Sequence, residues 1–410
     1  MYRTEIPVAI FKLKYLMSKT IQLPLLRDRH THPFLYASWF DGLNIHHVNS
    51  AQQAISLIAE CDVVDGEILI VQGWLDSKFQ ITADDLEPFG PSAVFNLSLH
   101  GLVMNESART MIEAELGEPG KWSDQIWFER NLRRILNAFA NLNGNADRLQ
   151  RFYDWLHAEH GVIYAEEMLL AGQKEIEVYR EAELLDRTRF WCSFEMWQTL
   201  PRDSRGLIHG MKIFTDGALG VRTAAVSSPF DNGDCGMLLY SDTELQKLFS
   251  DCIETEKSIA IHAIGDRAID QVVNLVRDRR QETRFTNEVR IEHAQLISLE
   301  AARRAREAGI ILSMQPNFSI DSVEYADRLA EHDAIGNNPF RMLIDEAGFV
   351  PGEDLIFGSD GMPHGAAAAV RQALNPPYPD RQALTIDELI AGYCDEEIYP
   401  SNETIEVQVE

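Results

Sequence analysis

The sequence predicts an α/β fold, a (β/α)8 TIM barrel that carries a helical insertion. From about residue 205 onward, short apolar segments alternate with amphipathic segments of helical period, the pattern of consecutive βα units. Several apolar segments end in histidine or aspartate, and the strands of a barrel all open onto one face. The length of 410 residues suits one barrel with insertions.

In the second half of the chain the βα rhythm is regular. Strands are expected at 210–215, 258–265, 289–295, 310–316 and 354–360. The segments between them have helical period, and the one before the fourth strand ends at Gly309, because glycine readily takes the left-handed conformation that terminates a helix.

The first half is less regular. Strands are expected at 23–32, 67–74, 91–98, 161–168 and 189–195. Residues 105–160 are predicted to be mostly helical, an insertion that forms either part of a pocket lid or a purely structural cover. We therefore divide the chain into an N-terminal extension (1–22), a barrel domain (23–394) and an acidic C-terminal tail or edge strand (395–410).

Composition excludes several classes of function. The 37 basic and 64 acidic side chains give a net charge of −27, which repels nucleic acid and anionic membranes. Apolar residues make up 45% of the chain, and no segment is long and apolar enough to span a bilayer. The five cysteines are scattered, without a CxxC pair, so we expect the protein to be located in a reducing cytoplasm. With nucleic acid and membranes excluded as partners, we expect a small-molecule substrate.

Histidines and an aspartate at predicted strand ends indicate a metal site. In the extended segment that ends at His32, the side chains of His30 and His32 point the same way and can reach one ion. His262, His293 and Asp360 also stand at or just past strand ends, so a barrel gathers them at the same face.

Lys212 lies within an apolar strand. Burial of its ammonium group is costly and lowers its pKa. A neutral amine can react with carbon dioxide to give a carbamate, an anionic ligand with two oxygens. The alternative is a lysine paired with Asp216 or Asp360.

These residues together resemble the ligand pattern of the amidohydrolase superfamily. The segments 211–226, 261–270, 290–298, 312–318 and 357–360 are similar to YtcJ-like amidohydrolases, the group that includes N-substituted formamide deformylases. The resemblance implies that His30 and His32 bind the more buried of two divalent cations and that His262 and His293 bind the more exposed one. It also implies that carboxylated Lys212 bridges them and that Asp360 contacts metal and water. Zinc suits these ligands.

The activity that this resemblance implies is hydrolysis of a non-peptide, amide-type carbon–nitrogen bond in a small molecule. Asp360 would act as general base and then general acid. Substrate contacts are expected from residues in or beside the similar segments: His100, Asp216, Arg222, Asp266, Gln315, His364 and Trp74. For each of them, a structural role in a salt bridge or in the core is the alternative.

Members of this superfamily usually carry a β-sandwich built from strands on both sides of the barrel. Here the expectation is a reduced or missing sandwich, with residues 1–22 as either its remnant or a simple extension. The bottom of the barrel is then covered in another way, such as by the second subunit of a homodimer. Two further functions stay open: a non-hydrolytic reaction at the same metal centre, such as isomerisation or decarboxylation, and a non-enzymatic binding protein.

Overall fold

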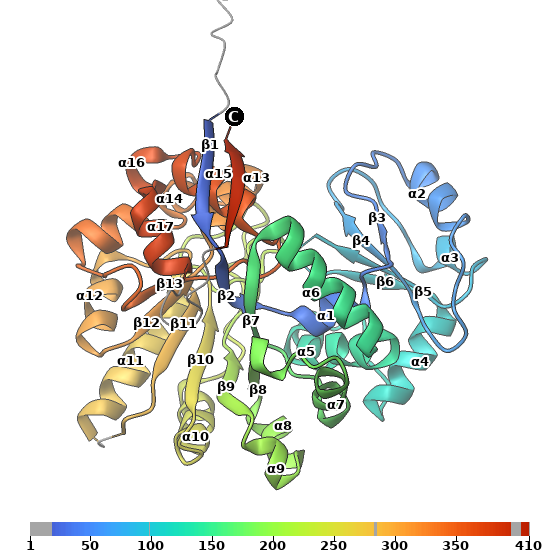
Figure 1. Cartoon of the computed structure of the whole chain (residues 1–410), viewed down its shortest axis with the longest axis horizontal. Coiled ribbons are helices and arrows are strands. Elements are labelled where there is room, and N and C mark those ends of the chain that lie inside the picture. The colour runs from blue at the N-terminus through green and yellow to red at the C-terminus, as the bar shows by residue number, and fades with distance from the viewer. Residues whose placement is uncertain (1–18, 98, 283–284, 395–402, 410) are drawn as a thin grey trace, which may run out of the picture.

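An eight-stranded parallel barrel forms the centre of the molecule (Figure 1). The computed structural model describes residues 19–97, 99–282, 285–394 and 403–409. The strands follow the order β13-β12-β11-β10-β9-β8-β7-β2 around the barrel. They are β2 (Leu26–Thr31), β7 (Val162–Glu167), β8 (Thr188–Cys192), β9 (Ile208–Phe214), β10 (Ser258–Ala263), β11 (Val289–His293), β12 (Ile311–Met314) and β13 (Leu355–Phe357).

The barrel closes where β13 meets β2. The amide of Ser359 donates to the Asp28 carboxylate at 2.8 Å, and the amide of Asp360 donates to the His30 carbonyl at 2.6 Å. The predicted barrel is therefore confirmed, and each of the five strands expected between residues 205 and 360 is present.

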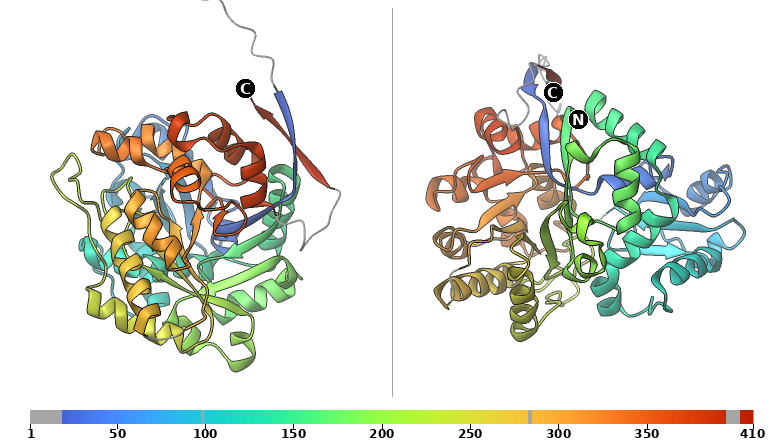
Figure 2. Two further views of the ribbon diagram at one scale, coloured as in Figure 1. Left: turned by 90° about the vertical axis from the view of Figure 1, so that its left-hand side faces the viewer. Right: turned by 60° about the horizontal axis from the view of Figure 1, so that its bottom comes forward.

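Helices cover the outside of the barrel and connect its strands (Figures 1 and 2). The helices of eight or more residues are α7 (Gln173–Glu181), α10 (Asp242–Ile253), α11 (Asp266–Glu282), α12 (Leu299–Glu307), α15 (Ala366–Leu374) and α17 (Ile386–Tyr393). The shorter ones are α8 (Phe194–Thr199), α9 (Arg202–Arg205), α13 (Asp321–Glu324), α14 (Glu331–Gly336), α16 (Pro379–Gln382), η1 (Leu185–Arg187), η2 (Pro316–Ile320) and η3 (Met342–Glu346). No helix in the described ranges is both long and apolar enough to cross a membrane.

A second sheet lies beside the barrel, on the right of Figure 1. It is formed by the part of the chain that connects β2 to β7. It contains β3 (Leu43–Asn44), β4 (Leu69–Trp74), β5 (Ser92–Asn96) and β6 (Leu102–Met104). The accompanying helices are α1 (Pro33–Ser38), α2 (Ala51–Ile58), α3 (Ala83–Leu86), α4 (Glu106–Leu116), α5 (Gln125–Asn143) and α6 (Ala146–His160). The segment between the first two barrel strands thus contains a sheet as well as helices.

The strands expected at 67–74 and 91–98 therefore form, but outside the barrel; Ser98 itself lies outside the described residues. Their side chains alternate between two cores. Ile70 and Phe95 join the main core of the barrel side, whereas Val71 and Val94 join a separate small core. A strand that is buried on both faces is apolar whether it belongs to the barrel or to the second sheet. The sequence pattern alone therefore does not show which sheet the strand joins.

A two-stranded antiparallel ribbon lies apart from both sheets (Figure 2). β1 (Lys19–Pro24) pairs with β14 (Thr404–Val409), with Leu23 opposite Ile405. In the described residues this ribbon is the only sheet besides the barrel and the four-stranded sheet. Most of the predicted N-terminal extension, 1–18, and residues 395–402 of the predicted acidic tail lie outside those residues.

Candidate metal centre and active site

Five strands bring polar side chains to the carboxyl-terminal mouth of the barrel. His30 and His32 come from the end of β2, Lys212 from β9, His262 from β10, His293 from β11, and Asp360 follows β13. All six were predicted to meet, and the contacts below show that they lie close together.

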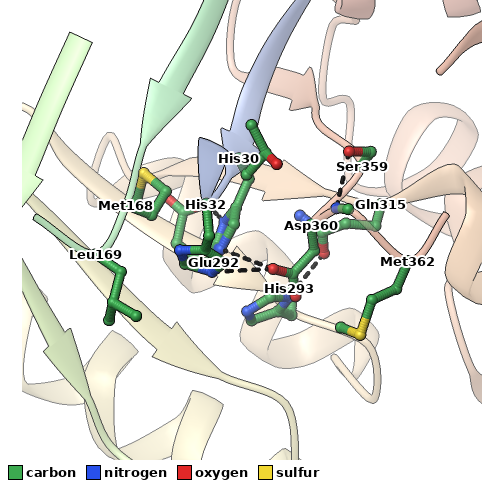
Figure 3. A network of polar contacts seen from close by, with 12 residues as sticks. His30, His32, Met168, Leu169, Glu292, His293, Gln315, Ser359, Asp360 and Met362 are labelled. Atoms are coloured by element: carbon green, nitrogen blue, oxygen red, sulfur yellow. Dashed lines mark hydrogen bonds and ion pairs between the residues drawn. The ribbon is translucent and has the colours of Figure 1, made fainter. Parts of the chain in front are cut away.

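His30, His293 and Asp360 form the centre of this group. One nitrogen or oxygen of each lies within 4.8 Å of the others. Nε2 of His32 is 3.1 Å from Oδ1 of Asp360, and Nε2 of His30 is 3.7 Å from the same oxygen. Figure 3 shows both imidazoles turned toward this carboxylate.

Lys212 and His262 complete the group. The Lys212 amine is 3.5 Å from Nε2 of His30, and the His262 ring centroid is 4.6 Å from that of His293. Burial lowers the pKa of Lys212 to about 8, because a low-dielectric interior disfavours the ammonium. The neutral amine that carboxylation requires is therefore accessible near neutral pH.

The protonation of the histidines fits a cation site. Burial and the nearby Lys212 hold the pKa of His30 well below the ordinary range, and burial and His262 do the same for His293. Both imidazoles are therefore neutral, as ligands must be. For His32, burial is outweighed by Asp360 and Glu167, which raise its pKa to about 9. A cation that binds here therefore replaces a proton on His32. Nδ1 of His32 is buried without a hydrogen-bond partner among the described residues.

Two side chains that the metal pattern did not include orient these imidazoles. Oε2 of Glu292 lies 2.6 Å from Nδ1 of His30, and Oε1 of Gln315 lies 2.8 Å from Nδ1 of His293 (Figure 3). A proton on each Nδ1 leaves Nε2 as the electron-pair donor. Glu292 was missed, although a carboxylate next to His293 within a predicted interior strand was the available signal; all five residues of β11 are buried.

A charged layer lies beneath the site inside the barrel. Arg290 links Glu292, at 2.9 Å, to Glu166, at 3.0 Å. Glu166 also pairs with Arg27 and Arg189, at 3.2 and 3.3 Å. Although burial alone raises the pKa of Glu166, Arg290, Arg189 and Arg27 lower it to about 2. The carboxylate behind His30 is thus part of a continuous buried ionic network.

The backbone fixes Asp360 in position. It has a positive φ of 56°, its amide donates to His30, and its carbonyl accepts a hydrogen bond from the Tyr36 hydroxyl at 2.9 Å. Burial raises the pKa of its carboxyl, but His30 and His32 outweigh burial and lower it below the ordinary range. Asp360 is therefore ionised and able to accept a proton.

A cavity of about 440 Å³ opens above the group. His262, His293 and Asp360 line the end of this cavity next to the predicted ligands, and His100 also borders it. Most of its wall is apolar; its acidic wall residues besides Asp360 are Asp321 and Glu324. Within the part of the chain that the structure describes, no lysine or arginine borders this cavity.

Comparison with known proteins gives the family. The Amidohydrolase family model matches residues 21–392. The chain belongs to the amidohydrolase family. YtcJ of Bacillus subtilis (strain 168), which carries an amidohydrolase name, is 32% identical over 77% of this chain and 66% of its own length. The N-substituted formamide deformylase of Arthrobacter pascens is 25% identical over 58% of this chain and 50% of its own length. The chain thus spans about two thirds or less of these relatives.

Solved structures show the same fold. An uncharacterized metal-dependent hydrolase from Pyrococcus horikoshii OT3 superimposes with a TM-score of 0.71 at 22% identity, covering 92% of this chain and 80% of that one. Another uncharacterized metal-dependent hydrolase, from Pyrococcus furiosus, gives a TM-score of 0.63 at 20% identity, covering 90% of this chain and 79% of that one.

Three residues expected to contact substrate in this amidohydrolase have other partners. Asp216 accepts the amides of Ala225, Ile264 and Gly265. Arg222 forms a two-point ion pair with Asp231, at 2.5 and 3.0 Å, and Asp266 accepts the amide of Ser227. None of the three borders the 440 Å³ cavity. Each meets a local backbone or charge requirement, which motif position alone could not reveal. Asp216 also borders a second cavity beside the site.

Three further expected contacts lie behind the cavity wall or beside it. Gln315 is engaged with His293, as described above. Nε2 of His364 is 3.0 Å from the Thr31 hydroxyl, so His364 supports the segment between the two predicted ligands of β2. Trp74 donates to the Phe79 carbonyl and borders an adjoining cavity of about 240 Å³.

Of the predicted substrate residues, only His100 borders the main cavity. Its Nδ1 is 2.8 Å from Oε2 of Glu129 on α5. Tyr36, His46, Asp321 and Tyr325 also border the cavity and were not predicted to do so. They lie on loops and short helices between β2 and β4 and after β12, where the sequence has no regular period.

Proposed function

We propose that this protein is a metal-dependent hydrolase that cleaves a non-peptide, amide-type carbon–nitrogen bond of a small molecule. The observation that carries the proposal is the convergence of four imidazoles, Lys212 and Asp360 at the barrel mouth, directly below a largely apolar cavity. The family match and the name of the Arthrobacter pascens relative support this reaction class.

The proposed ligands of one or two divalent cations, most simply zinc, are His30, His32, His262, His293, Asp360 and Lys212 as its carbamate. Such a cation lowers the pKa of a bound water and polarises the carbonyl of the substrate. Glu292 and Gln315 hold two of the imidazoles with Nε2 available.

Asp360 carries the proposed proton transfer. Its ionised carboxylate accepts a proton from the attacking water and then donates that proton to the leaving nitrogen. Apolar cavity residues such as Leu99, Leu219 and Phe318 exclude water and favour an uncharged substituent next to the scissile bond.

Asp360→Asn tests this role. The amide cannot take up the proton, so we expect kcat to fall by about 10²- to 10⁴-fold, while the metal content stays close to that of the wild type because the other ligands are retained. The measurements are amine release from a panel of N-formyl and N-acyl amines and metal analysis of the same samples. Asp278→Asn, at a side chain that is 56% exposed on α11, is the matched control. Full activity of Asp360→Asn would refute the role of Asp360.

The metal proposal has its own test. Intact-protein mass spectrometry under native conditions should detect metal and a carboxylated Lys212, and Lys212→Ala should lack the carbamate. Protein that contains neither metal nor carbamate, whatever cation is supplied, would contradict the proposed centre.

A further inference from the structure

A second cavity approaches the site from the side of α5. It has a volume of about 390 Å³ and meets the main cavity at His100, which borders both. Lys212 and Asp216 border it, together with residues of α5, of β9, of the start of α8, and of α10 and the segment before it. A group of the substrate can therefore occupy this cavity while the remainder reaches the barrel mouth.

Arg133 on α5 is an incompletely paired cation in this wall. Its side chain is only 20% exposed, and its one ion pair within the described residues is a long contact of 3.7 Å with Glu195, whose side chain is 67% exposed. The guanidinium makes no hydrogen bond to any described residue. By contrast, Arg134 on the next position donates to Glu118 at 2.6 Å and to Asn131 at 3.0 Å. An arginine offers five donors, so Arg133 has most of its capacity free for another partner.

Two neighbours add to the donor capacity of this wall. Arg130 lies one turn before Arg133 on the same face of α5; it donates to the Leu239 carbonyl at 3.0 Å and makes no ion pair within 4.0 Å of a described carboxylate. The Tyr240 side chain also borders the cavity, and its hydroxyl has no hydrogen-bond partner within the described ranges. Burial lowers the pKa of Arg133, and Glu195 and Tyr240 only partly offset this effect, so its charge lacks full compensation.

From these contacts we infer that the second cavity binds a carboxylate group of the substrate, with Arg133 as its principal partner and Tyr240 and Arg130 beside it. This inference rests on the proposed function in taking the amide substrate to extend from the metal site past His100. The planar fork of arginine matches the two oxygens of a carboxylate. Glu129, Glu195 and Asp216 border the same cavity, and their negative charge favours a monoanionic group over a phosphate dianion.

The test is a binding measurement that needs no turnover. The full-length, metal-loaded protein is titrated calorimetrically with adipate and, as the uncharged probe of the same chain length, with 1,6-hexanediol. Adipate should bind, and its affinity should fall about tenfold or more in Arg133→Gln, the loss expected when a charge-assisted hydrogen bond is removed. Arg134→Gln removes the same charge from the wall of the same cavity, but this guanidinium is already paired with Glu118 at 2.6 Å, so the affinity should change less than twofold.

Glu195→Gln is an independent variant that should change the affinity for adipate in the opposite direction. Removal of the one carboxylate that competes for Arg133 should raise the affinity for adipate several-fold, and this result does not depend on the fold of Arg133→Gln. Equal losses in Arg133→Gln and Arg134→Gln, binding of 1,6-hexanediol as tight as that of adipate, or an unchanged affinity in Glu195→Gln would each overturn the inference. Because the probes are not hydrolysed, failure of the amide-hydrolysis proposal would leave this result intact, and the reverse also holds.

Discussion

The orientation of His30 depends on a carboxylate from a different strand. Glu292 on β11 lies 2.6 Å from Nδ1 of His30 on β2, and Arg290 pairs with the other oxygen of Glu292 at 2.9 Å. The imidazole is thus fixed both in ring orientation and in tautomer. A residue that touches neither a cation nor the substrate therefore determines whether Nε2 of His30 can act as a ligand.

Glu292→Gln should weaken metal binding. The neutral amide is a poorer acceptor for the Nδ1 proton, so His30 becomes a less basic and less well oriented ligand. We expect metal affinity to fall about 10- to 100-fold, measured by competition with a chromophoric chelator. Glu288→Gln, four residues earlier at an exposed position, is the control and should bind metal as the wild type does. Unaltered affinity in a folded Glu292→Gln protein would contradict this role.

At the scale of elements, sequence period predicted the second half of the chain well and the first half only in part. Strands β9, β10, β11 and β13 carry a lysine, histidine or aspartate near or just after their carboxyl ends. Because β9 to β13 also alternate with helical segments, both their type and their placement follow from local pattern. β4 and β5 are as apolar as barrel strands, because one face of each packs on the small core and the other on the main core. Which sheet a strand joins depends on long-range packing, which local period does not encode.

Phe95 on β5 is where the second sheet is anchored to the main core. Its side chain is fully buried, and its ring centroid lies 4.6 Å from that of Trp39 and 5.0 Å from that of Phe139. Phe95→Ala should lower the free energy of unfolding by about 3–5 kcal/mol, because the cavity left between β5 and α5 cannot be refilled. Denaturant unfolding measures this change. Val64→Ala, at a residue that is 56% exposed, should stay within about 0.5 kcal/mol of the wild type, and an equally small effect in Phe95→Ala would show that the sheet is anchored elsewhere.

At the scale of the whole molecule, the barrel interior is arranged in layers. Glu166 on β7 joins arginines from β2, β8 and β11, and the polar group of the metal site lies above them at the carboxyl-terminal mouth. The predicted ligands could be recognised from sequence because each lies near the carboxyl end of a strand or within a few residues after one. The walls of the two cavities could not, since they combine the insertion with three barrel connections, and only the folded chain places Arg133 near Lys212.

The ionic layer gives a pH-dependent contribution to stability whose sign can be stated. The folded-state pKa of Glu166 is about 2, below its ordinary value of 4.5, so its stabilisation is fully present above about pH 4.5 and is lost as pH falls toward 2. At pH 7, Glu166→Gln removes a buried carboxylate that pairs with three arginines and should lower the free energy of unfolding by about 3–5 kcal/mol. The difference between the two proteins should shrink between pH 4.5 and 3, as the wild-type carboxylate is protonated in the unfolded chain. Urea unfolding of both proteins across this range measures it; a difference that is constant with pH would show that Glu166 contributes by packing rather than by charge.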